Sequence, residues 1–109
     1  MSHAVLVHGG TMVRRTSLAQ ALRVAGDLDV RVRVSSRAAE AAKCLADPAV
    51  VAVFLVDAPD DENAVRAAAT ARGLASTVYA LQPRDTADVV VSLARAAVVR
   101  EREKPAVAR

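Results

Sequence analysis

The sequence has 109 residues, 53% of them hydrophobic, and its 15 Lys and Arg against 12 Asp and Glu give a formal net charge of +3. This length predicts one domain with a real core and little room for a second module. With one Phe, one Tyr and no Trp, the composition excludes a base-stacking surface for single-stranded nucleic acid, which needs several exposed aromatic rings. The small basic excess is typical of a solvated surface.

The sequence also predicts where the chain resides. No apolar run approaches the ~18 residues of a membrane-spanning helix, so we expect no membrane contact. The opening Met1-Ser2-His3 lacks the basic region of a signal peptide. The single cysteine, Cys44, cannot form an internal disulfide. We therefore expect a cytoplasmic protein.

The first half of the chain alternates short apolar runs with segments of helical periodicity. The first run stops at His8-Gly9-Gly10, a sequence suited to tight backbone geometry. Strict alternation of Val and Arg over residues 30–34 is typical of an edge strand with one half-covered face. The predicted elements are a strand at 4–7, a helix at 11–25, a strand at 30–34 and a helix from the capping Ser35-Ser36 to residue 46.

The run from Val51 to Val56 is apolar throughout and ends on Asp57. A short run bounded by Asp47-Pro48 and Pro59 is typical of a strand buried on both faces. Both faces are covered only when helices lie on each side of the sheet. Asp57 should then lie at the carboxyl end of a central parallel strand, where open α/β sheets place their sites.

The last third of the chain predicts a helix ending near Gly73, a strand at 77–81 and a final helix from Asp85 to Arg100. The final helix has an Ala- and Val-rich face that allows close approach of a second helix, and we interpret it as a candidate dimer face formed by Val89, Val90, Leu93, Ala96 and Ala97. Residues 101–109 are highly charged and predict a tail or linker stub, which leaves a domain at 1–100.

Strands that alternate with helices predict right-handed βαβ units and a parallel sheet. The expected fold is a three-layer α/β/α sandwich with flavodoxin-like topology, in which four parallel strands follow the order 2-1-3-4. The sequence does not decide whether a fifth strand exists. Lys104-Pro105 could follow such a strand, but the residues before them are a poor strand sequence.

The segment from Val5 to Arg14, the Val/Arg alternation and the run ending at Asp57 resemble the receiver domains of bacterial response regulators. The resemblance covers roughly residues 4–97. It implies that Asp57 occupies the position of the phosphoacceptor aspartate. It also implies that His8 and Gly9 replace the acidic pair that holds Mg²⁺, and that Gln82 replaces a Thr or Ser. An alternative alignment deletes one β-α unit and places Gln82 at the position of the family's lysine.

These departures remove the oxygen ligands that a hard cation needs and the main charge stabilisation of phosphoryl transfer. The resemblance therefore implies a non-enzymatic pseudo-receiver without a cofactor or metal, used as a regulatory module in two-component signalling or transcription control. An uncovered sheet edge favours a partner, which is a second copy of the chain or a regulatory protein. DNA would be bound only through a separate output domain.

Asp57 and His8 each have two further interpretations. Asp57 could be a working phosphoacceptor, or it could cap the following turn through its side-chain oxygens. His8 could carry a phosphoryl group received by the amides of residues 10–13, or it could be a partly exposed loop residue. A hydrolase is disfavoured, because the chain lacks a Gly-x-Ser-x-Gly elbow, and the scattered His and Cys residues form no zinc motif.

Overall fold

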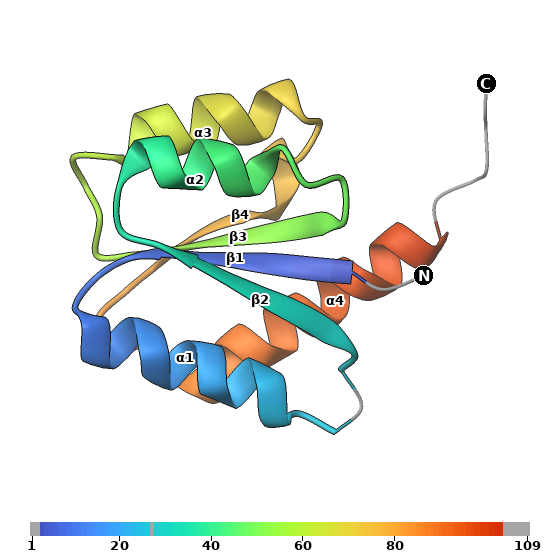
Figure 1. The fold of residues 1–109 in the computed structure, drawn as a ribbon. Helices are drawn as coiled ribbons and strands as arrows, with labels where there is room; N and C mark the ends of the chain where they lie inside the picture. The colour runs from blue at the N-terminus through green and yellow to red at the C-terminus, as the bar shows by residue number, and fades with distance from the viewer. Residues whose placement is uncertain (1–2, 27, 104–109) are drawn as a thin grey trace.

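The computed structural model describes residues 3–26 and 28–103, in which strands and helices alternate (Figure 1). The strands are β1 (His3–Gly9), β2 (Val30–Ser35), β3 (Val50–Val56) and β4 (Val78–Leu81). The helices are α1 (Met12–Val24), α2 (Ala38–Leu45), α3 (Glu62–Ala71) and α4 (Ala87–Glu103), and a 3-10 turn, η1 (Ala75–Thr77), precedes β4. None of the helices in these ranges is both long and apolar enough to cross a bilayer.

The described strands form one parallel sheet in the order β2-β1-β3-β4. Helices α2 and α3 cover one face, and α1 and α4 cover the other (Figure 1). A parallel neighbour can be reached only by a crossover, which is why a helix follows each strand. The structure confirms the predicted three-layer sandwich and its strand order.

The core is centred on β3, whose seven residues are all buried. Phe54 and Val56 contribute to the layer that contains α1 and α4, whereas Val53 and Leu55 contribute to the layer that contains α2 and α3. Phe54 stacks on Tyr79 of β4 with ring centroids 5.5 Å apart. The prediction of a strand buried on both faces is therefore confirmed, and Asp57 follows its carboxyl end.

Helix α4 is shifted relative to its predicted bounds. It continues through residues 101–103, which were expected to begin a charged tail. Arg and Glu are good helix formers, so the alternating charges extend the helix instead of ending it. Residues 104–109 of the proposed tail lie outside the described residues, and residues 100–103, the poor strand sequence before Lys104-Pro105, are helical.

The candidate dimer face on α4 is divided by the packing of the helix. Val90 and Ala97 are 0% and 2% exposed and lie in the core beside α1 and the sheet. Val89 and Ala96 are exposed, and Leu93 is partly buried. Because successive residues rotate by about 100° around a helix, these five side chains do not form the single exposed face that the sequence predicted.

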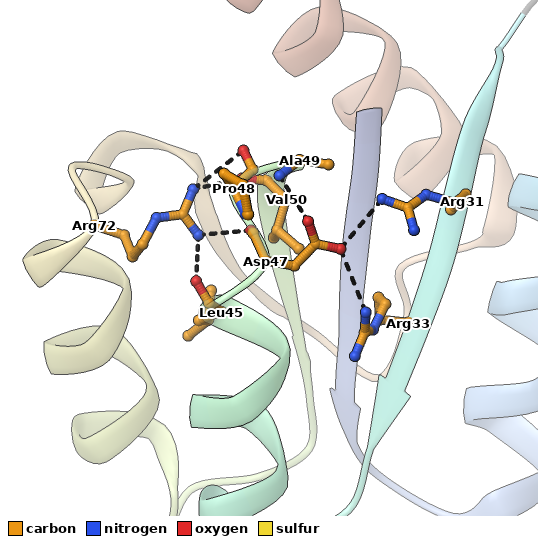
Figure 2. A network of polar contacts seen from close by, with 8 residues as sticks. All are labelled: Arg31, Arg33, Leu45, Asp47, Pro48, Ala49, Val50 and Arg72. Atoms are coloured by element: carbon orange, nitrogen blue, oxygen red, sulfur yellow. Dashed lines mark hydrogen bonds and ion pairs between the residues drawn. The ribbon is translucent and has the colours of Figure 1, made fainter. Parts of the chain in front are cut away.

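The predicted site lies where the strands end. At the other end of the sheet, where the strands begin, Asp47 links the loop between α2 and β3 to strand β2 (Figure 2). Its Oδ2 atom accepts hydrogen bonds from Arg31 at 3.2 Å and Arg33 at 3.3 Å. Its Oδ1 atom accepts one from the backbone N–H of Ala49 at 2.9 Å. This N–H, together with the two arginine charges, lowers the pKa of the Asp47 carboxyl from its usual 3.8.

Arg72 holds the same loop from the side of α3 (Figure 2). Its guanidinium group donates to the backbone carbonyls of Leu45, Asp47, Pro48 and Val50. These carbonyls belong to the end of α2, the loop and the start of β3, where regular structure leaves backbone acceptors without partners. The two networks together fix the point at which β3 enters the sheet.

Asp47→Asn should lower the free energy of unfolding at neutral pH, and this difference from the wild type should disappear in acid. The folded-state pKa of Asp47 lies below 3.8, so its contribution is complete above that value and is lost as the pH falls through the folded-state pKa. Urea unfolding of both proteins from neutral to strongly acidic pH measures the effect. Asp60→Asn, which removes an exposed carboxylate elsewhere, is the control. A difference that stays constant with pH would contradict the assignment.

Candidate functional site

The carboxyl ends of the parallel strands meet at one edge of the sheet, and the predicted site residues lie there. His8 and Gly9 end β1, Asp57 follows β3 and Gln82 follows β4. Asp57 lines a shallow hollow with Gly9 and Gly10, and it lines others with Gln82. The edge therefore brings together all the positions that the sequence singled out as a degenerate receiver site.

His8 is completely buried at this edge and belongs to β1. Its Nδ1 atom lies 2.7 Å from Ser35 Oγ, and its Nε2 atom lies 3.1 Å from Asp61 Oδ2. An ionised carboxylate only accepts hydrogen bonds, so these partners assign the ring proton of the neutral imidazole to Nε2 and the acceptor role to Nδ1. The expectation of a partly exposed loop histidine is therefore wrong, because burial and two hydrogen bonds hold the ring.

These bonds limit what His8 can do chemically. Both ring nitrogens are engaged, and the ring has no exposed surface. A phosphoryl group on either nitrogen would have to displace Ser35 or Asp61. The buried imidazole instead connects the ends of β1 and β2 to the residue that precedes α3.

Ser35 and Asp61 are the two residues of this cluster that sequence reasoning missed. It assigned Ser35 to a helix cap and did not connect Asp61 with His8. The parallel register places Ser35 directly beside His8, and the signal was that a polar residue follows the apolar residues of each strand. Asp61 lies 53 positions from His8 in the sequence, and no local pattern connects the two.

The hydrogen-bonded side chains Ser35, His8 and Asp61 are of the same types as the catalytic residues of serine hydrolases. Those enzymes need an exposed nucleophile and nearby hydrogen-bond donors for the oxyanion. Ser35 is only 3% exposed. The backbone N–H groups of Ser36 and Arg37 next to it both donate to Glu40 Oε1, at 3.1 Å each. With a buried hydroxyl and occupied neighbouring donors, the hydrogen-bonded group serves to satisfy a buried histidine.

Gly9 and Gly10 have φ values of +90° and +70°, which favour glycine. A Cβ atom on Gly9 would lie 2.6 Å from the Cβ atom of Ala58 and 2.7 Å from the carbonyl oxygen of Val56. No side chain fits there without a shift of β3 or of the loop after it. A carboxylate is therefore sterically excluded from position 9 of this backbone.

Asp57 is exposed, and its φ of 45° lies in the left-handed region, which Asp adopts more readily than most residues. Its carboxylate makes no hydrogen bond or ion pair to any residue within 3–26 or 28–103. The proposed turn-capping role is therefore not observed. Asp57 is a free carboxylate at the end of the central strand.

Gln82 lies in the loop between β4 and α4, which α1 holds in place. The guanidinium group of Arg14 donates to the carbonyls of Gln82, Pro83 and Asp85 at 3.1, 3.2 and 3.3 Å. Asp85 was expected to cap the last helix, but its carboxylate accepts the backbone N–H of Gln82 at 2.7 Å. The Gln82 side chain itself is exposed beside Asp57.

These residues do not fit the magnesium ion that the acidic pair of receiver domains holds. A hard cation prefers several oxygen ligands, whereas position 8 holds a buried imidazole and position 9 has no room for a side chain. Asp61, a further carboxylate that lines the hollow beside Asp57, is bonded to His8. Within the described ranges, no three His, Cys, Asp or Glu side chains are arranged to hold a metal ion.

Comparisons of the chain with family models, with curated proteins and with solved structures found no match. The receiver resemblance therefore depends on the short motifs around residues 5–14 and 54–57. The geometry of the site has to be interpreted from its own contacts.

Ser35→Ala should lower the free energy of unfolding by about 1–3 kcal/mol, because it leaves Nδ1 of the buried His8 without a partner. Ser36→Ala is the matched control. The Ser36 hydroxyl bonds Glu40 at the exposed surface, and its removal should change stability by less than about 0.5 kcal/mol. Urea denaturation of the three proteins measures both values. Equal effects of the two substitutions would contradict a buried role for Ser35.

Proposed function

We propose that this chain is a non-enzymatic regulatory module that binds a protein partner and works without phosphorylation. It is a pseudo-receiver, used in signalling or transcription control. The observation that carries the proposal is the state of His8. Where the family has a carboxylate for Mg²⁺, this chain has a fully buried ring with hydrogen bonds at both nitrogens.

The charges around Asp57 support the same proposal. Phosphoryl transfer to a carboxylate brings two anionic groups together, and a metal ion normally neutralises them. Here the hollow beside Asp57 is lined by the further carboxylates of Asp60 and Asp61. The Arg14 guanidinium, which also borders Asp57, already donates to three backbone carbonyls.

A second candidate function is that of a receiver phosphorylated on Asp57. Its carboxylate is exposed and free at the end of the central strand, which is where a phosphoacceptor has to be. The phosphocarrier alternative on His8 has weaker support, since both ring nitrogens are engaged. DNA contact through a separate output domain and a cytoplasmic location stay predictions.

Intact-mass measurement after incubation with acetyl phosphate and Mg²⁺ tests the proposal. We expect no added phosphoryl group in the wild type, because the described residues contain no group of side chains that could hold a metal ion to assist the transfer. Asp57→Asn, His8→Gln and the control Asp60→Asn are treated in parallel. Circular dichroism of His8→Gln and the wild type tests whether the variant is folded.

Two results would contradict this expectation. A phosphoryl group that is base-labile and lost only in Asp57→Asn would identify an acyl phosphate and a working receiver. A phosphoryl group lost only in His8→Gln would identify a phosphocarrier. Asp60→Asn should behave as the wild type in either case.

A further inference from the structure

In the part of the chain that the structure describes, the outer edge of β4 is uncovered. β4 lies at the end of the described sheet, where its one described partner is β3. Within residues 3–26 and 28–103, the backbone N–H and C=O groups on its outer side have no strand partner. Such an edge recruits a further strand unless charges, prolines or bulges protect it. β4 is short, with four residues, but its sequence, Val-Tyr-Ala-Leu, carries no charge and no proline, and Ala80 is exposed.

The other edge of the sheet is protected. β2 carries Arg31 and Arg33, whose side chains are 55% and 40% exposed and share the Asp47 carboxylate. In an antiparallel pair, residues directly opposite each other share one face of the sheet. If β2 strands of two copies paired about Val32, Arg31 of one copy would lie opposite Arg33 of the other. If they paired about Arg33, the two Arg33 side chains would lie opposite each other. Like charges opposite each other are destabilising, so the edges differ in their capacity for self-pairing.

A stripe on α4 borders the β4 side of the molecule. Val89, Leu93, Ala96 and Arg100 are spaced by four, three and four residues, which places them on one helix face. Arg100 donates to Ser76 Oγ at 3.4 Å, and Ser76 lies in η1 just before β4. This contact orients the stripe toward the free edge. Its apolar members are the three residues of the predicted dimer face that are not buried in the core.

The charges at the two ends of this stripe are complementary. Asp85, which precedes α4 and accepts the Gln82 N–H, lies where β4 ends, whereas Arg100, followed three residues later by the exposed Glu103, lies where β4 begins. A two-fold axis perpendicular to the sheet reverses the direction of the second copy. It therefore brings the Asp85 end of one stripe toward the Arg100 end of the other, with Leu93 near the centre. A second copy of the chain therefore offers this edge a strand of the same sequence to pair with, and it brings Asp85 of each copy toward Arg100 of the other.

We propose that β4 pairs antiparallel with β4 of a second copy about a two-fold axis at Ala80, and that the α4 stripe borders this interface. Ala80 then lies opposite Ala80 of the second copy, and Tyr79 lies opposite its Leu81. The paired strands satisfy each other's outer backbone groups and join the two sheets. This inference rests on the proposed function, because it names the partner of the regulatory module.

Sedimentation velocity of the full chain over a wide concentration range tests the dimer. The wild type should dimerise in a concentration-dependent way. Ala80→Lys should raise the dimer dissociation constant about tenfold or more, because it sets two ammonium groups opposite each other on the paired strands. Val34→Lys, at an exposed position on β2, is the matched control and should leave the constant within about twofold.

A wild type that stays monomeric up to millimolar concentration overturns the inference, as does a Val34→Lys variant that weakens the dimer as much as Ala80→Lys. Thermal melting of each variant establishes that a loss of dimer is not a loss of fold. The phosphodonor measurement separates the two proposals. An unphosphorylated monomer overturns only the dimer, whereas a dimer phosphorylated on Asp57 overturns only the pseudo-receiver.

Discussion

The burial of β3 on both faces is the constraint on which the rest of the structure depends. All seven of its residues are shielded from water, so its backbone polar groups need partners within the sheet. β1 and β4 supply them on either side. The faces of β3 need apolar cover as well, which α1 and α4 give on one side and α2 and α3 on the other. A strand enclosed in this way meets solvent only where it ends, and Asp57 lies there.

A second constraint acts at that same end of the sheet. Buried polar groups are costly unless they are hydrogen-bonded, and both ring nitrogens of His8 have partners from two other segments of the chain. The ring therefore fills a position that open α/β sheets commonly leave for a ligand. Its bonds hold the edge together, while the neighbouring Asp57 stays free. At the carboxyl ends of the strands, His8 and its partners therefore stabilise the fold, and Asp57 beside them is exposed to solvent.

The fold could be predicted from the sequence because its signals are local: the apolar run at 51–56, the alternation at 30–34 and the helical spacing between them. The buried site could not, since Ser35 and Asp61 lie 27 and 53 positions from His8 and only the assembled sheet joins them. The face of α4 was also ambiguous. Ala and Val occur on several sides of this helix, and their pattern alone does not separate Val90 in the core from Val89 outside it.

The strand order has a consequence for how the chain folds as it is synthesised. β2 joins one side of β1, β3 joins the other, and β4 joins β3, so none of the described strands has to insert between two that already pair. The sheet can therefore grow outward as the chain emerges, N-terminal part first. Asp47 emerges just before β3, and its single negative charge offsets part of the charge of the two β2 arginines that bond it. The repulsion on the outer strand is thus reduced as the third strand becomes available to dock.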